Sequence, residues 1–145
     1  MKIAIVAAQF NTDISERLTE GAIHFFEHYK KQGHPITYKV FHVPGALELP
    51  ALITKLAETK QYDGYIALGC VIKGETDHYG AVCDGVTYGL QMVSITKGAA
   101  LTNGVLMCTH KDQAIERSMP KQANNKGYEC AQGIVQMVQL FKELF

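Results

Sequence analysis

The residues best suited to chemistry lie in one stretch, residues 66–79. An apolar run of strand length ends there in a polar turn, Gly74-Glu75-Thr76, which is followed by His78. Free backbone N–H groups at the start of a helix attract anions, and a histidine can transfer protons near neutral pH. The turn could therefore hold one phosphate group, although an ordinary strand-to-helix turn would look similar. The nucleotide-binding patterns GxxxxGK[ST] and GxGxxG are absent from the sequence.

Further candidates follow other apolar runs of the sequence. Phe10 could stack on a flat heterocycle or fill the local core, and Asn11 beside it could pair with ring amide groups. Glu48 lies in an apolar setting, where its carboxylate could accept hydrogen bonds from substrate hydroxyls. It could equally be a solvent-facing acid favoured by the helix dipole.

Two cationic candidates lie nearer the C-terminus. Arg117 could bind phosphate with its planar guanidinium, or it could form a surface ion pair with an acid such as Asp112. Lys126 flanks a polar loop and could be solvated. A histidine, cations, a phosphate-sized turn and an aromatic ring together suit a phosphorylated substrate that meets a flat, hydroxylated one.

The elements that must position these residues alternate along the chain. We expect strands at residues 2–8, 36–43, 65–72 and 104–108, and helices at residues 13–32, 47–60, 78–96, 110–118 and 127–145. This order predicts an α/β fold for one domain, residues 1–145, in the form of a three-layer flavodoxin-like sandwich. Its four-stranded parallel sheet, of order 2-1-3-4, has helices on both faces. The segments that follow parallel strands meet at one edge, so the candidate residues should lie close together.

Some local features carry expectations of their own. Asp13 and Glu16 have the spacing of a capping box, and Thr109 with Asp112 could cap the short fourth helix. The third helix contains three glycines, Gly80, Gly85 and Gly89. They would weaken an isolated helix, so we expect close packing against a neighbouring helix, such as one on another subunit.

The composition excludes several classes of function. The 145 residues include 14 basic and 14 acidic residues with no block of like charge, so nucleic acid and acidic membranes are poor partners. No apolar run approaches the ~18 residues of a membrane span. The apolar start, residues 1–8, is short and reads as a strand rather than a signal peptide, which predicts a cytoplasmic protein.

Neither the cysteines nor the histidines predict a metal site. The four cysteines are widely spaced and include no CxxC pair: Cys70, Cys83, Cys108 and Cys130. We expect reduced, mostly buried thiols. His24 and His28 are four residues apart on the first predicted helix, where we expect them on its outer face rather than on a metal.

Five segments resemble the lumazine synthase family and stand in the order found in that family. They are Phe10-Asn11, residues 43–50 (VPGALELP), residues 68–79 (LGCVIKGETDHY), residues 113–117 (QAIER) and residues 125–127 (NKG). The resemblance covers nearly the whole chain. It implies a transferase of riboflavin biosynthesis that condenses 5-amino-6-(D-ribitylamino)uracil with 3,4-dihydroxy-2-butanone 4-phosphate. The product is 6,7-dimethyl-8-ribityllumazine, phosphate and water are released, and neither a metal nor an organic cofactor takes part.

The resemblance also implies roles for residues that would hold the pyrimidine substrate. Phe10 would stack on the ring. The ribityl chain would lie against three consecutive residues, Ala46, Leu47 and Glu48. The pyrimidine would be bordered, partly by backbone groups, by Cys70, Val71 and Ile72.

On the phosphate side, the resemblance implies that Glu75 and Thr76 bind the phosphate together with Arg117. His78 would be the proton-transfer residue. Lys126 would be a supporting cation near the phosphate or the intermediate.

Several positions depart from the usual pattern of the family. Leu47 replaces a phenylalanine, Cys70 a threonine and Lys73 an arginine. Asn103 stands where many members have a phenylalanine that reaches into the site of a neighbouring subunit, so this contact should be more polar here.

The resemblance further implies a homo-oligomer. Family members assemble as pentamers with sites between subunits, and some pentamers pack into sixty-subunit shells. This chain starts almost at its first strand, without the N-terminal arm that often pairs with a neighbour. The loop at residues 118–125 is about one residue longer than in shell formers. We therefore expect a free pentamer.

Two alternatives belong to other classes of protein. One is a non-catalytic flavin- or nucleotide-binding module with a flavodoxin-like sheet, and the other is a scaffold with a degraded site. The presence of His78, Glu48 and Arg117 argues against degradation. Mixing the protein with both substrates and following lumazine fluorescence would separate an enzyme from a binding module.

Overall fold

The computed structural model describes residues 1–120 and 124–145. At its centre lies a sheet of four parallel strands, β1 (Lys2–Ala8), β2 (Thr37–Val43), β3 (Gly64–Ile72) and β4 (Leu101–Cys108). Their spatial order is β2-β1-β3-β4, which confirms the predicted order 2-1-3-4.

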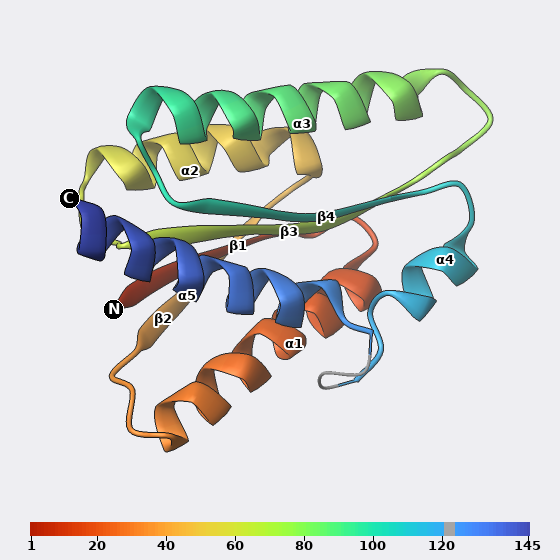
Figure 1. Ribbon diagram of the computed structural model, residues 1–145. Helices are drawn as coiled ribbons and strands as arrows, with labels where there is room; N and C mark the ends of the chain where they lie inside the picture. The colour runs from red at the N-terminus through yellow and green to blue at the C-terminus, as the bar shows by residue number, and fades with distance from the viewer. Residues whose placement is uncertain (121–123) are drawn as a thin grey trace.

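Helices cover both faces of this sheet (Figure 1). α2 (Leu49–Glu58) and α3 (His78–Lys97) lie on one face, and α1 (Thr12–Lys31) and α5 (Lys126–Leu144) lie on the other. The short α4 (Lys111–Glu116) follows β4 at the end of the sheet where the parallel strands finish. The prediction of a three-layer, flavodoxin-like α/β sandwich is therefore confirmed.

β1 shows why its sequence is a continuous apolar run. Residues 3–8 are all buried, and successive side chains enter two different cores. Ile3 and Ile5 pack in the core under α1 and α5, whereas Ala4 and Val6 pack in the core under α2 and α3. A strand covered by helices on both faces cannot alternate between apolar and polar residues.

α1 does not begin with the predicted capping box of Asp13 and Glu16. It begins at Thr12, and Asn11 occupies the N-cap position in the left-handed conformation, with φ 54°. No side chain among the described residues caps this end by a hydrogen bond. The Asp13 carboxylate instead lies 3.0 Å from Nζ of Lys111, which lowers the pKa of Asp13 by a hydrogen bond.

Two other helix starts also differ from the predictions. The helix predicted at residues 47–60 begins as a 3₁₀ turn, η1 (Ala46–Glu48), and continues as α2 with Pro50 in its first turn, as expected. The predicted cap of α4 by Thr109 with Asp112 is wrong. Oε1 of Gln113 accepts bonds from the backbone N–H groups of Thr109 (2.9 Å) and His110 (3.3 Å). The predicted loop at 119–125 contains residues 121–123, which lie outside the described residues.

The glycines of α3 have their close neighbour within the same chain. A Cβ atom at Gly85 would lie 2.9 Å from Cδ2 of Leu47, and one at Gly89 would lie 2.7 Å from Cγ of Pro50. α3 can therefore approach η1 and α2 closely. At Gly80 a Cβ atom would meet no atom within 4 Å, so the expected close contact is found at two of the three glycines.

The cysteines are free thiols, and Cys70, Cys108 and Cys130 are buried while Cys83 is half-buried. The described residues contain no group of three or more His, Cys, Asp or Glu side chains that could hold a metal ion. Among the helices of the described residues, none is both long enough and apolar enough to cross a membrane.

Candidate active site

A cavity of about 400 Å³ opens where β1 and β3 end. Fourteen residues line it, and they come from the end of β3 and from the segments that follow β1, β2 and β3: Phe10, Asn11, Gly45, Ala46, Leu47, Glu48, Cys70, Val71, Ile72, Gly74, Thr76, His78, Tyr79 and Val82. The parallel sheet thus brings together most of the residues predicted from the sequence. Glu75 lies in the same turn as Gly74 and Thr76 without lining the cavity.

One wall of this cavity is a length of β3 that β1 does not cover. The pairing of β1 with β3 ends at Ala7 opposite Leu68, yet β3 continues to Ile72. On its other side β3 stays paired with β4 up to Ile72 opposite Cys108. The last residues of β3 therefore present one free edge to the cavity.

Asn11 closes part of that edge. Its Nδ2 donates a hydrogen bond to the backbone oxygen of Cys70 at 2.9 Å. The amide nitrogen of Asn11 is therefore already bonded within the protein. For the predicted pairing with a substrate amide, its amide oxygen remains. This bond also explains why the Asn11 side chain does not cap α1.

Two large apolar side chains stand exposed at the rim of the cavity. The side chain of Phe10 is 73% exposed and that of Leu47 is 48% exposed. Phe10 thus does not fill the local core, which was the alternative to stacking on a substrate. An exposed ring beside a cavity provides an apolar face for a flat heterocycle.

Glu48 ends the 3₁₀ turn, and its carboxylate folds back toward the preceding turn. A Cβ atom at Gly45 would lie 2.9 Å from Oε2 of Glu48. Glycine at position 45 therefore leaves room for the carboxylate in this orientation. Glu48 is exposed and can accept hydrogen bonds from hydroxyl groups in the cavity.

His78 is the first residue of α3 and lines the cavity. Its backbone N–H donates to Oγ1 of Thr76 at 3.4 Å, so the Thr76 hydroxyl acts as an acceptor at the helix start. The proton of that hydroxyl remains able to donate to an anion. The start of α3 hence combines a hydroxyl, helix N–H groups and an imidazole.

Cys70 is buried in the same wall, with 2% of its surface exposed. Burial, with the neighbouring Cys108 thiol as a lesser cause, raises the pKa of the Cys70 thiol to about 12. The thiol at this position therefore stays protonated near neutral pH and acts as a small apolar group, not as a nucleophile.

The raised pKa of Cys70 predicts a loss of stability at alkaline pH. The unfolded thiol ionises near its ordinary pKa of 9.0, whereas the folded thiol keeps its proton to about 12. The contribution of Cys70 to the free energy of unfolding is thus complete below pH 9 and falls as the pH rises from 9 toward 12. Between pH 8 and pH 10.5, the free energy of unfolding measured with urea should decline more steeply for the wild type than for Cys70→Ala. Parallel declines would contradict this.

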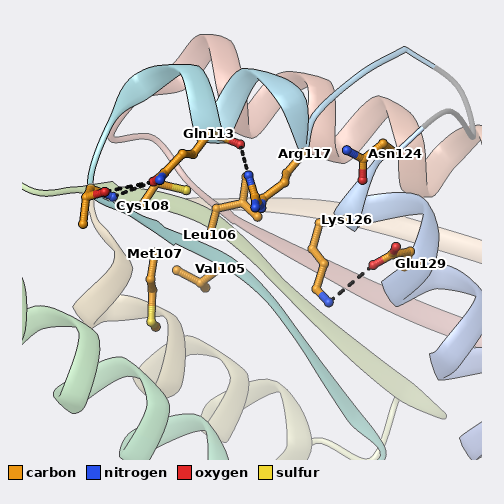
Figure 2. Close-up of a pocket in the computed structure, with 10 residues that line it drawn as sticks. Val105, Leu106, Met107, Cys108, Gln113, Arg117, Asn124, Lys126 and Glu129 are labelled. Atoms are coloured by element: carbon orange, nitrogen blue, oxygen red, sulfur yellow. Dashed lines mark hydrogen bonds and ion pairs between the residues drawn. The ribbon is translucent and has the colours of Figure 1, made fainter.

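Arg117 and Lys126 line a second cavity, of about 620 Å³, beside β4 (Figure 2). Arg117 donates from Nη1 to the backbone oxygen of Gln113 at 2.9 Å, and Lys126 pairs with Glu129 at 3.4 Å. The acid near Arg117 is Glu116, at 3.7 Å, rather than the predicted Asp112. This cavity shares no lining residue with the cavity of His78.

Asn103 lies near the start of β4 and lines neither the cavity of His78 nor that of Arg117. It lines a smaller cavity, of about 360 Å³, together with Lys126 and Glu129. Its Oδ1 accepts a hydrogen bond from the backbone N–H of Val105 at 3.0 Å. The side-chain oxygen is therefore used within the chain.

Sequence reasoning missed the structural role of Asn125, the residue directly before Lys126. Asn125 is 1% exposed and caps α5, accepting at Oδ1 from the backbone N–H of Tyr128 at 3.1 Å. Its Nδ2 donates to the backbone oxygens of Arg17 (3.0 Å) and Met119 (2.8 Å). An Asn directly before a helix is a known capping signal, but its long-range bond to α1 leaves no mark in the sequence.

Comparison with known proteins agrees with this geometry. The family model for 6,7-dimethyl-8-ribityllumazine synthase matches residues 1–142. The 6,7-dimethyl-8-ribityllumazine synthase of Coxiella burnetii (strain Dugway 5J108-111) is 40% identical over 143 residues, which cover 99% of this chain and 93% of that protein. The chain therefore belongs to the 6,7-dimethyl-8-ribityllumazine synthase family.

Proposed function

We propose that this protein condenses 5-amino-6-(D-ribitylamino)uracil with 3,4-dihydroxy-2-butanone 4-phosphate to form 6,7-dimethyl-8-ribityllumazine in riboflavin biosynthesis. Membership of the family supports this activity. The observation that carries it is the single cavity in which Phe10, Glu48, Thr76 and His78 meet at the free edge of β3. We place the reaction in the cytoplasm, where thiols such as the buried Cys130 stay reduced.

The test is a fluorescence assay with both substrates. Lumazine fluorescence should grow only when the protein and both substrates are present, and inorganic phosphate should appear in equal amount. Binding of a flavin without any turnover would instead support the non-catalytic binding module.

The pyrimidine would lie between Phe10 and the end of β3. The exposed ring of Phe10 would stack on the heterocycle, while backbone groups of Val71 and Ile72 border its polar edge. The ribityl chain would extend along η1, where Glu48 accepts bonds from its hydroxyls and Ala46 and Leu47 supply apolar contact.

His78 would carry the protons that the reaction moves. Attack of the amine on the ketone gives a carbinolamine, which loses water to form a Schiff base. Phosphate elimination and ring closure with loss of a second water follow. Each of these steps requires a proton to be taken up or released, and one positioned general acid and base serves them in turn.

The leaving phosphate would lie at the start of α3. The Thr76 hydroxyl and the helix N–H groups would bind it, with Glu75 contributing through its backbone N–H. Such an anion also requires a cation, and Arg117 is suited to the task because its guanidinium can bind two phosphate oxygens at once.

We infer that the cations reach the phosphate from a second copy of the chain. Arg117 and Lys126 line a cavity that has no residue in common with that of His78, so one chain holds two half-sites. Asn103 lies beside Lys126 and would present its amide nitrogen to the neighbour's site.

A closed ring of copies, which we propose to be a pentamer, would join each half-site to its complement. The outer side of α3 carries exposed Tyr88, Met92 and Ile95, spaced to form one apolar face. Burying this face between copies would account for its composition.

Replacing Arg117 with alanine should weaken binding of the phosphate substrate far more than binding of the pyrimidine. The loss of charged hydrogen bonds to phosphate should raise the KM of the butanone phosphate by about 10- to 100-fold. The KM of the pyrimidine should change little. Arg17→Ala, which removes the other arginine from an exposed place on α1, is the matched control. Equal increases in both KM values would argue against the phosphate role.

The same variant tests the shared site. His78→Ala and Arg117→Ala are each expected to be poorly active, but refolding them together should restore activity if each site uses two copies. With random mixing, about one quarter of the sites would pair an intact His78 with an intact Arg117. No recovery in mixed oligomers, shown to be mixed by mass spectrometry, would place both residues in a site of one chain.

A further inference from the structure

Asn11 lies at the point where β1 ends and β3 continues alone. The chain leaves the sheet after Ala8. The backbone N–H of Gln9 donates to the backbone oxygen of Val43, at the end of β2, at 2.9 Å. The Asn11 carbonyl then accepts the N–H groups of Ile14 (3.0 Å) and Ser15 (3.1 Å) at the start of α1. The short segment of residues 9–11 is therefore held at one end by the sheet and at the other by α1.

The side chain of Asn11 supplies the bond that a longer β1 would have made. In the paired region the backbone of β1 forms hydrogen bonds with the backbone of β3, and this pairing ends at Leu68. Cys70, which is buried and faces the same side two residues later, has its carbonyl bonded to Nδ2 of Asn11 at 2.9 Å. A buried carbonyl without a partner would be costly, so this bond stabilises the free end of β3.

The alternation of the strand places Ile72 next along the same edge. The backbone N–H of Lys73 donates to Cys108 at 2.9 Å, so residue 73 faces β4. Since successive residues of a strand direct their N–H and C=O groups to opposite sides, Ile72 faces the side of Asn11 and the cavity. The peptide groups of Ile72 then offer one donor and one acceptor, which suits the amide edge of a pyrimidine.

We infer that Asn11 is a positioning residue that fixes the free edge of β3 for the pyrimidine and acts through Cys70 rather than by touching the substrate. The left-handed conformation at φ 54° supports this role, because few residues adopt it and Asn is one of them. The inference rests on the proposed function, since it assigns the pyrimidine to this edge.

Two substitutions distinguish the proposed role of the Asn11–Cys70 hydrogen bond from a direct contact between Asn11 and the substrate. Asn11→Gly keeps the left-handed backbone without strain and removes the side chain. Asn11→Asp keeps the shape and an acceptor oxygen but removes the donor, and it places a carboxylate against the Cys70 carbonyl. Both variants should raise the KM of the pyrimidine about tenfold, with Asn11→Asp the worse of the two, while the KM of the butanone phosphate stays within about twofold. If Asn11 instead touched the substrate through its oxygen, Asn11→Asp would bind the pyrimidine as well as the wild type does.

Hydrogen–deuterium exchange gives a readout that does not depend on turnover. Peptides spanning residues 70–72 should exchange faster in both variants, while peptides from the buried strand β1 exchange as in the wild type. Lys60→Gly is the matched control, because Lys60 has the same φ of 54° but lies in the loop between α2 and β3, before the start of β3 and at the opposite end of this strand from residues 70–72. It should leave both KM values and the exchange at residues 70–72 unchanged.

Three results would overturn the inference: unchanged exchange at residues 70–72, wild-type pyrimidine binding by Asn11→Asp, or equal increases in both KM values. A wild-type protein that makes no lumazine would refute the proposed function instead. In that case the exchange experiment would still decide whether Asn11 holds the edge of β3.

Discussion

Replacing His78 with alanine is expected to lower kcat by about 10²–10⁴-fold and to leave the fold intact. The imidazole lines the same cavity as Phe10 and Thr76, where we propose that the proton transfers of the condensation take place. His78 is exposed and lies at the very start of α3, so its side chain contributes little to the core. The effect should therefore appear in kcat, while the KM values change less.

The matched control for this loss is His28→Ala. His28 is exposed on the far part of α1, where its ring lies 3.3 Å from the Gln32 amide. This substitution should preserve turnover. Urea unfolding and light scattering would show that His78→Ala keeps the stability and oligomer of the wild type. An unchanged rate for His78→Ala would remove this residue from the mechanism.

Replacing Gly127 with alanine should destabilise the protein by about 3–5 kcal/mol. Gly127 lies in the first turn of α5, and a Cβ atom there would overlap the backbone carbonyl of Leu18 on α1. Backbone atoms cannot rotate away as a side chain can, so α1 and α5 would have to move apart. Urea unfolding curves of the two proteins would measure the difference.

Gly133→Ala in the same helix is the matched control. A Cβ atom there would lie at an ordinary contact distance of 3.5 Å from Cγ2 of Thr102. Since glycine weakens the interior of a helix, this substitution should stabilise the protein by up to about 1 kcal/mol. If Gly127→Ala behaved like Gly133→Ala, the close approach of α1 to α5 would be wrong.

The contact at Gly127 bears on function as well as stability. Asn125 joins α1 to the start of α5, and a Cβ atom at Gly21 would overlap its side chain. The backbone N–H of Lys126 donates to the Arg117 carbonyl at 2.9 Å, so the two cations are tied to the same junction. Forcing α1 and α5 apart should therefore displace the proposed phosphate-binding cations more than it displaces His78.

The sequence by itself determined the sheet and the location of the cavity. The apolar runs at residues 2–8 and 65–72 predicted buried parallel strands, because a strand covered by helices on both faces needs apolar residues at every position. Parallel strands end at one edge, so the segments after them had to converge. Phe10, Glu48 and His78 were thus predicted to lie at one edge of the sheet, and they line one cavity there.

Only the tertiary structure decided the helix starts, the glycine contacts and the separation of Arg117 from His78. Asn11, not Asp13, occupies the N-cap position of α1, and its amide donates to a carbonyl far along the chain, at Cys70, instead of capping the helix. Gly85 and Gly89 of α3 lie close to Leu47 and Pro50 of the same chain. Arg117 lies in a different cavity from His78. Each of these depends on distances between residues remote in sequence, which local spacing and residue type do not encode.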